Sequence, residues 1–162
     1  TIFAIFAGIY FWFPKITGKT MNEVLGKVHF WGSLVCMNGI FMPMFLQGLA
    51  GVSRRLATGG YDYAHAQQAD VIWLNVVMSY SAFALFAFQL VFIFNFFWTL
   101  FRNRYGSETD TNPWKATTIE WTDTTSPPLG HGNFESIPSV YRGAYEYSVD
   151  GHEKDYYPQT EK

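Results

Sequence analysis

The sequence predicts an all-α integral membrane protein with an extended, non-helical tail, and three observations support this fold class. Residues 28–53 and residues 71–101 contain no Lys, Arg, Asp or Glu. At about 1.5 Å of rise per residue, a helix of either length exceeds the ~30 Å hydrocarbon core of a bilayer. Fifteen of the 16 Phe residues precede residue 102, whereas 16 of the 24 formal charges follow residue 101. These patterns exclude a soluble monomeric globule for residues 1–101.

Charge and residue types exclude several function classes. The formal net charge of −2 provides no basic stripe for nucleic acid. The single cysteine, Cys36, lies in an apolar run and has a structural interpretation. The four His residues lack the helical spacing of a metal pair, and His29 is interpreted as structural. No nucleophile triad, phosphate loop or paired carboxylates are visible, so no catalytic or metal-binding residue is assigned.

The first two elements are an apolar segment and a short loop. Residues 1–13 are predicted to form the second half of a transmembrane helix, because thirteen residues reach only about 20 Å. The chain is therefore expected to be a C-terminal piece of a larger protein. Pro14 and Gly18 are predicted to end this helix, and residues 14–21 form a loop.

Two full transmembrane helices are predicted next, over residues 22–47 and 71–101. The Thr20/Glu23 spacing is that of a capping box at the start of the first, and Pro43 is expected to bend it. The glycine-rich residues 48–70 form an irregular loop between them. Polar side chains inside a membrane normally face other helices, so most are interpreted as helix–helix contacts within a larger bundle. They are Ser33, Asn38, Gln47, Asn75, Ser79, Tyr80, Ser81, Gln89 and Asn95.

Basic residues near the helix ends set the expected orientation. Lys15, Lys19 and Lys27 flank the first loop, and Arg102 and Arg104 follow the last helix. By the positive-inside rule, these ends face the cytoplasm or matrix, and the 48–70 loop lies outside. The Arg54–Arg55 pair in that outer loop opposes the rule. It indicates either a specific anionic partner or a solvated turn.

The tail, residues 102–162, is polar and contains five prolines, which favour extended segments. It has too few aliphatic side chains for a core of its own. We expect it to lie as a strap on the inner face of a partner, with Trp114 and Trp121 as aromatic anchors.

Ordered blocks of residues over about positions 1–140 resemble the C-terminal end of the catalytic subunit I of haem-copper cytochrome oxidases. The blocks include Tyr10-Phe11-Trp12-Phe13-Pro14-Lys15-Ile16-Thr17-Gly18, Gly26-Lys27-Val28-His29-Phe30-Trp31, Phe41-Met42-Pro43-Met44, Arg54-Arg55, Trp73-Leu74-Asn75, Asn112-Pro113-Trp114 and Ser126-Pro127-Pro128. The family's usual Pro-Met-His-Phe-Leu-Gly-Leu is here Pro43-Met44-Phe45-Leu46-Gln47-Gly48-Leu49. That departure removes a histidine from the outer end of the helix.

The resemblance implies a twelve-helix bundle, of which this chain supplies the end of helix ten, helices eleven and twelve, and the tail. It implies two haems held mainly by residues outside this chain, copper with its ligands outside this chain, and Arg54 and Arg55 as ligands of the haem propionates. An Arg fork suits a carboxylate, because it offers two parallel charge-assisted hydrogen bonds and never loses its proton.

The function implied is that of a respiratory terminal oxidase, which reduces oxygen to water and translocates protons. Its partners would be the rest of subunit I, other oxidase subunits, the lipid membrane and either cytochrome c or quinol as electron donor. The location would be a bacterial plasma membrane or a mitochondrial inner membrane. Two alternatives are a non-catalytic membrane scaffold derived from oxidase sequence and part of a transporter, the latter disfavoured by the lack of ionisable residues at mid-membrane depth.

Overall fold

The computed structural model describes residues 1–53, 55–102, 111–122, 124–128, 137–144 and 157–162, together with Phe134, Glu146 and Gly151. These residues form helices and no strands, which confirms the all-α prediction. The chain divides into two units, one of Asn22–Phe97 and one of Thr1–Met21 with Trp98–Lys162. Each unit is described by itself below.

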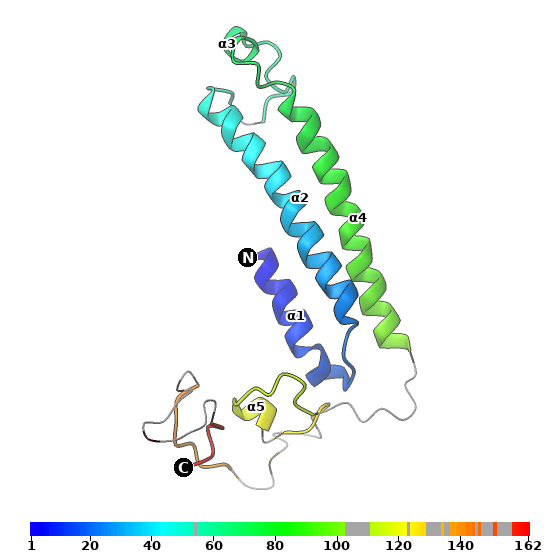
Figure 1. Ribbon diagram of the computed structural model, residues 1–162, viewed down its shortest axis with the longest axis vertical. Coiled ribbons are helices and arrows are strands. Elements are labelled where there is room, and N and C mark those ends of the chain that lie inside the picture. Colours follow the sequence, from blue (N-terminus) through cyan, green and yellow to red (C-terminus); the bar gives the residue numbers. More distant parts are fainter. Residues whose placement is uncertain are drawn as a thin grey trace. The chain divides into compact units, whose positions relative to one another are not determined.

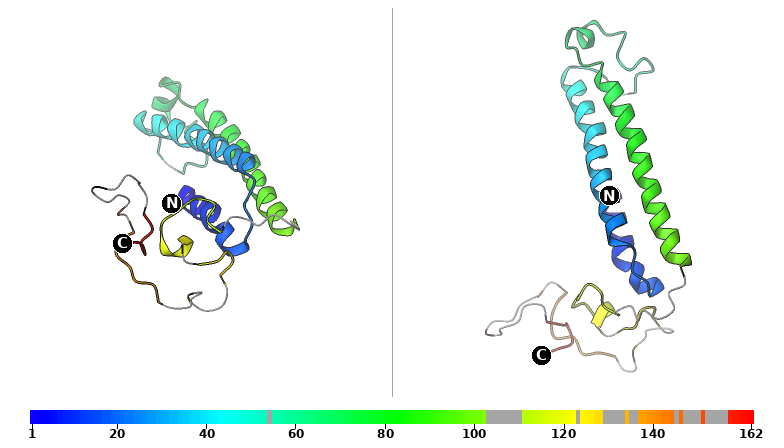
Figure 2. Two further views of the ribbon diagram at one scale, coloured as in Figure 1. Left: turned by 60° about the horizontal axis from the view of Figure 1, so that its bottom comes forward. Right: turned by 45° about the vertical axis from the view of Figure 1, so that its right-hand side comes forward.

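Two helices of the described chain are long and apolar enough to cross a membrane. They are α2 (Glu23–Leu49) and α4 (Leu74–Phe101), while α1 (Ile2–Thr17) is a shorter apolar helix. Within the unit Asn22–Phe97, α2 and α4 run side by side in opposite directions in every view (Figures 1 and 2). Helix α3 (Ala64–Gln68) lies in the segment between them, which the sequence predicted to be irregular throughout.

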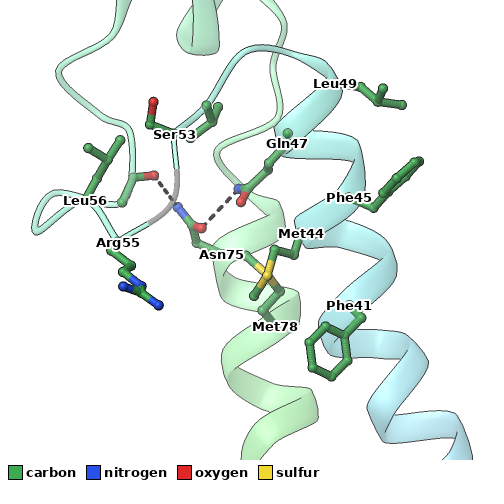
Figure 3. A pocket seen from close by; sticks show the side chains of 13 residues that line it. Phe41, Met44, Phe45, Gln47, Leu49, Ser53, Arg55, Leu56, Asn75 and Met78 are labelled. Atoms are coloured by element: carbon green, nitrogen blue, oxygen red, sulfur yellow. Dashed lines mark hydrogen bonds between the residues drawn. The ribbon is translucent and has the colours of Figure 1, made fainter.

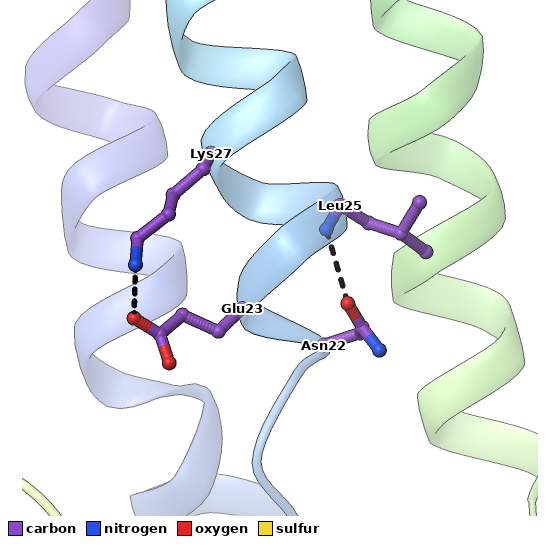
Figure 4. Close-up of polar contacts among 4 residues, drawn as sticks. All are labelled: Asn22, Glu23, Leu25 and Lys27. Carbon is purple, nitrogen blue, oxygen red and sulfur yellow. Dashed lines mark hydrogen bonds and ion pairs between the residues drawn. The ribbon is translucent and has the colours of Figure 1, made fainter.

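Helix α2 begins two residues later than a Thr20 cap would place it. Asn22 is the N-cap, and its Oδ1 accepts a hydrogen bond from the Leu25 amide at 3.0 Å. Lys27 pairs with Glu23 on the same exposed turn at 2.6 Å (Figure 4). At the N-cap, the Asn22 side-chain oxygen pairs one of the amides that the first turn of a helix leaves without a partner. At the other end the helix continues through Pro43 to Leu49, two residues beyond the predicted segment.

Small residues let α2 and α4 approach closely. A Cβ atom on Gly32 would overlap the Phe88 ring, and one on Gly39 would overlap Ser81. This close contact brings polar side chains together, as expected for helices in lipid. Gln89 Nε2 donates to Ser33 Oγ at 3.0 Å, and Gln89 Oε1 lies 3.4 Å from His29 Nε2. His29 is buried, in agreement with its structural interpretation.

A second polar contact joins the ends of the two helices where α2 begins. The Asn95 side chain is fully buried. Its Oδ1 accepts from the Asn22 amide and its Nδ2 donates to the Asn22 carbonyl, both at 3.0 Å. One side chain on α4 therefore bonds both backbone groups of the α2 N-cap residue, whose carbonyl also accepts from the Gly26 amide at 3.0 Å.

The other unit combines α1 with the described parts of the tail. Helix α1 does not end at Pro14: it continues one turn to Thr17 and stops at Gly18, whose φ of 66° is left-handed. Proline lacks an amide hydrogen but does not prevent the final turn, which the Gly18 amide closes on the Pro14 carbonyl at 2.8 Å.

The tail packs on α1 through the two predicted aromatic anchors. Trp114 stacks on Phe11 with ring centroids 6.2 Å apart and donates from Nε1 to the Phe11 carbonyl at 2.9 Å. Trp121 meets Phe11 edge-on at 5.2 Å and is 1% exposed. Lys15 donates to the carbonyl and hydroxyl of Thr124. These contacts confirm that Trp114 and Trp121 anchor the tail. The surface they cover is α1 of the same chain and not a partner, because Phe11 offers an aromatic face there.

The tail is not wholly non-helical, since Trp121 lies in the four-residue helix α5 (Ile119–Thr122). The last residues of the chain hold this helix through Gln159. The Gln159 amide donates to the Thr117 carbonyl and its Oε1 accepts from the Ile119 amide, both at 3.2 Å. Gln159 also accepts from the Tyr141 amide and donates to the Arg142 carbonyl. The end of the chain therefore caps the helix that carries Trp121.

Candidate functional site

A cavity of about 730 Å³ lies at the end of α2, within the unit Asn22–Phe97 (Figure 3). Its walls are mostly apolar and come from the last turns of α2, the following loop and the first turns of α4. The lining residues are Phe41, Met44, Phe45, Gln47, Gly48, Leu49, Val52, Ser53, Arg55, Leu56, Gly59, Asn75 and Met78. Among these described residues Arg55 is the charged one, so the cavity combines an apolar wall with one guanidinium.

Arg55 has an unusual backbone conformation. Its φ is 61°, a left-handed value that costs a non-glycine residue free energy and that proteins retain mainly where surrounding structure enforces it. Its side chain is exposed. Within the described part of the chain, neither Asp62 nor Asp70 forms an ion pair with it, so the guanidinium is available for an anion.

The loop that carries Arg55 is attached to both long helices. The Gly59 amide donates to the Leu56 carbonyl at 3.2 Å and closes a turn directly after Arg55. Asn75 Nδ2 on α4 donates to the Gly59 carbonyl at 2.9 Å. Gln47 Nε2 on α2 in turn donates to Asn75 Oδ1 at 3.0 Å (Figure 3). The same Gln47 nitrogen donates to the Val71 carbonyl at 3.0 Å.

The predicted site residues have different outcomes. Arg55 lies against the cavity, whereas Arg54 falls outside the described residues. Gln47 and Asn75 were predicted as helix–helix contacts, which they make, but their attachment to the Arg55 loop was missed. One feature of the sequence could have indicated a role for Gln47: it lies in the block Pro43–Leu49, which departs from the family pattern. Within the described residues, His, Cys, Asp and Glu side chains do not gather in a group of three that could hold a metal ion.

Two helices long and apolar enough to cross a membrane, joined by polar side-chain contacts, are typical of a helical integral membrane protein. The family model described as "Cytochrome C and Quinol oxidase polypeptide I" matches residues 1–84. The chain belongs to this family, the subunit I family of cytochrome c and quinol oxidases.

Individual relatives agree with the family match. The chain is 42% identical over 161 residues to the alternative cytochrome c oxidase subunit 1 of Bradyrhizobium diazoefficiens, covering 99% of this chain and 26% of that protein. It is 42% identical over 148 residues to cytochrome c oxidase subunit 1 of Synechocystis sp., covering 91% of this chain and 24% of that protein. It is 38% identical over 151 residues to cytochrome c oxidase subunit 1 of Thermostichus vulcanus, covering 93% of this chain and 25% of that protein. The chain thus spans about a quarter of the length of these curated relatives.

Proposed function

We propose that this chain is the C-terminal part of the catalytic subunit of a respiratory terminal oxidase, which reduces oxygen to water and translocates protons. Within that subunit it would hold haem propionates through Arg54 and Arg55. The observation that carries the proposal is Arg55, which lines an apolar cavity and has no carboxylate partner within the described residues. The oxidase activity itself follows from the family and would need residues outside this chain.

The residues around the cavity fit an edge of a haem. A haem is an apolar macrocycle with two carboxylates, and the cavity offers apolar walls together with a guanidinium that can bind a carboxylate bidentately. When bound, haem supplies the redox-active iron. The role of this chain is to bind and orient the propionate, and to place a permanent positive charge near it.

The location and partners follow from the same proposal. The 48–70 loop would lie on the outer side of a bacterial plasma membrane or a mitochondrial inner membrane, with the tail on the cytoplasmic or matrix side. The partners would be the rest of subunit I, other oxidase subunits and an electron donor, either cytochrome c or quinol. Copper would be bound outside this chain.

Replacing either arginine tests the propionate role. Arg54→Met and Arg55→Met should leave the complex assembled but lower the midpoint potential of at least one haem and slow turnover. Loss of one charged hydrogen bond costs on the order of 1–3 kcal/mol. An uncompensated negative charge favours oxidised iron, so the shift should be downward by roughly tens of millivolts for one electron. A redox titration of each assembled variant measures it.

Arg102→Met is the matched control, because that arginine lies at the opposite end of α4 from the cavity. Its potentials should equal those of the unmodified complex. Assembled Arg54→Met and Arg55→Met complexes with unshifted potentials and normal oxygen consumption would mean that the pair is a solvated turn. The scaffold alternative would then gain support.

Filling the cavity is a second, independent test. Gly48 lines the cavity, and a Cβ atom built on it meets no heavy atom within 4 Å. Gly48→Phe should therefore occupy the cavity and reduce haem content, measured from the absorption spectrum of the purified complex. Gly48→Ala adds one methyl group and should retain the full spectrum. Equal haem content in the two variants would show that the cavity holds no part of the cofactor.

A further inference from the structure

The left-handed backbone of Arg55 needs contacts that hold it in place. A left-handed backbone at a non-glycine residue persists only when its surroundings enforce it. Arg55 has this conformation, and the turn that follows it is closed by the Gly59 amide on the Leu56 carbonyl. The loop itself offers little burial, because Ser53 and the described residues 55–58 are exposed or half-buried. Side chains on the two helices supply a further restraint.

The two helices meet the loop through one pair of amide side chains. Asn75 Nδ2 reaches the Gly59 carbonyl, and Gln47 Nε2 fixes the orientation of Asn75 by donating to its Oδ1. Gln47 is buried at 6% exposure, where an unpaired amide is costly, so this orientation is strongly preferred. A Cβ atom on Gly59 would lie 3.0 Å from Asn75 Nδ2. The loop therefore passes close to Asn75, and glycine at 59 permits both that approach and its φ of 61°.

We propose that Asn75 and Gln47 are positioning residues, which together hold the turn after Arg55 so that its guanidinium faces the cavity. This inference rests on the proposed propionate role of Arg55. The Asn75 and Gln47 side chains act through the Gly59 backbone and set the geometry and charge placement of the arginine. Their loss should release the turn while leaving the guanidinium in the chain.

The test uses Asn75→Leu in the intact complex, with Gln47→Leu as a milder variant that keeps Asn75. Asn38→Leu is the matched control, because the Asn38 amide donates to the Leu34 carbonyl of its own helix. The first readout is hydrogen–deuterium exchange of the peptide covering residues 55–61. We expect exchange to be about tenfold faster in Asn75→Leu, as for the loss of one buried hydrogen bond, and unchanged in Asn38→Leu.

The second readout is the haem midpoint potential of single and double variants. Asn75→Leu should lower it in the same direction as Arg55→Met but by less. Because Asn75 acts through Arg55, the double variant should match Arg55→Met alone, and a merely structural defect would instead add to it. Gln47→Leu should show the same pattern with a smaller shift, which keeps the test available if Asn75→Leu does not assemble.

The outcomes separate this inference from the propionate role. Unchanged loop exchange in both variants, or additive shifts in the double variant, would overturn the positioning role. An unshifted potential in Arg55→Met would overturn propionate binding by Arg55 and with it the functional part of the positioning role. In that case faster loop exchange in Asn75→Leu would still show that Asn75 restrains the turn.

Discussion

Replacing Trp121 with alanine is expected to make the tail roughly a hundredfold to several thousandfold more susceptible to proteolysis in the assembled complex. Trp121 is 1% exposed and packs edge-on against Phe11, with Lys15 5.4 Å above its ring. Truncating a buried tryptophan to alanine costs roughly 3–5 kcal/mol. When a segment opens and recloses faster than it is cut, cleavage follows the open population. Limited proteolysis with mass spectrometry of the fragments measures the rate.

Two further variants sharpen this prediction. Trp114 packs on the same Phe11 ring but is 47% exposed, so Trp114→Ala should have a smaller effect. The Trp121 indole N–H is buried without a hydrogen-bond partner in the structure described, so Trp121→Phe removes no hydrogen bond and should be milder than alanine. Equal cleavage of Trp121→Ala and the unmodified tail would contradict the anchoring role. A larger effect of Trp114→Ala than of Trp121→Ala would contradict the expectation that Trp121 is the stronger anchor.

Replacing Asn95 with leucine should release the start of α2. Leucine has the same branched shape but makes neither of the two bonds that Asn95 supplies to Asn22. The Asn22 carbonyl still accepts from the Gly26 amide at 3.0 Å, so the Asn22 amide is the group most affected. Loss of the partner of one backbone amide costs about 1–3 kcal/mol where water is excluded, as it is at the fully buried Asn95 side chain. We expect much faster amide exchange over residues 22–26 and a lower yield of assembled complex, measured by exchange mass spectrometry and by the recovery of purified complex.

The same Asn→Leu change at position 38 is the control, because Asn38 is exposed and bonds within α2. If Asn95→Leu and Asn38→Leu behave alike, the Asn95 contact does not stabilise the start of α2.

The sequence by itself determined the class, the long helices and the family. Crossing a bilayer requires a long uncharged apolar run, which is a local property of composition, and α2 and α4 cover the two runs that have it. The family is likewise carried by the order of residues, and the match over residues 1–84 confirms the resemblance. The anchoring tryptophans were also predictable, because large aromatic side chains in a polar tail need a surface to cover them.

The tertiary structure decided how polar groups are paired and how the loop is held. Sequence marked Gln47, Asn75, Asn95 and Gln89 as polar residues inside helices, but their partners depend on the rotation and register of α2 against α4. The turn after the left-handed Arg55 is joined to α4 by the bond between Gly59 and Asn75, which are 16 positions apart. The tail's use of its own α1 has the same origin. Hydropathy and local propensity predict whether one segment is helical and whether it lies in lipid or water. They do not predict which segments contact each other, and the contacts named above depend on that.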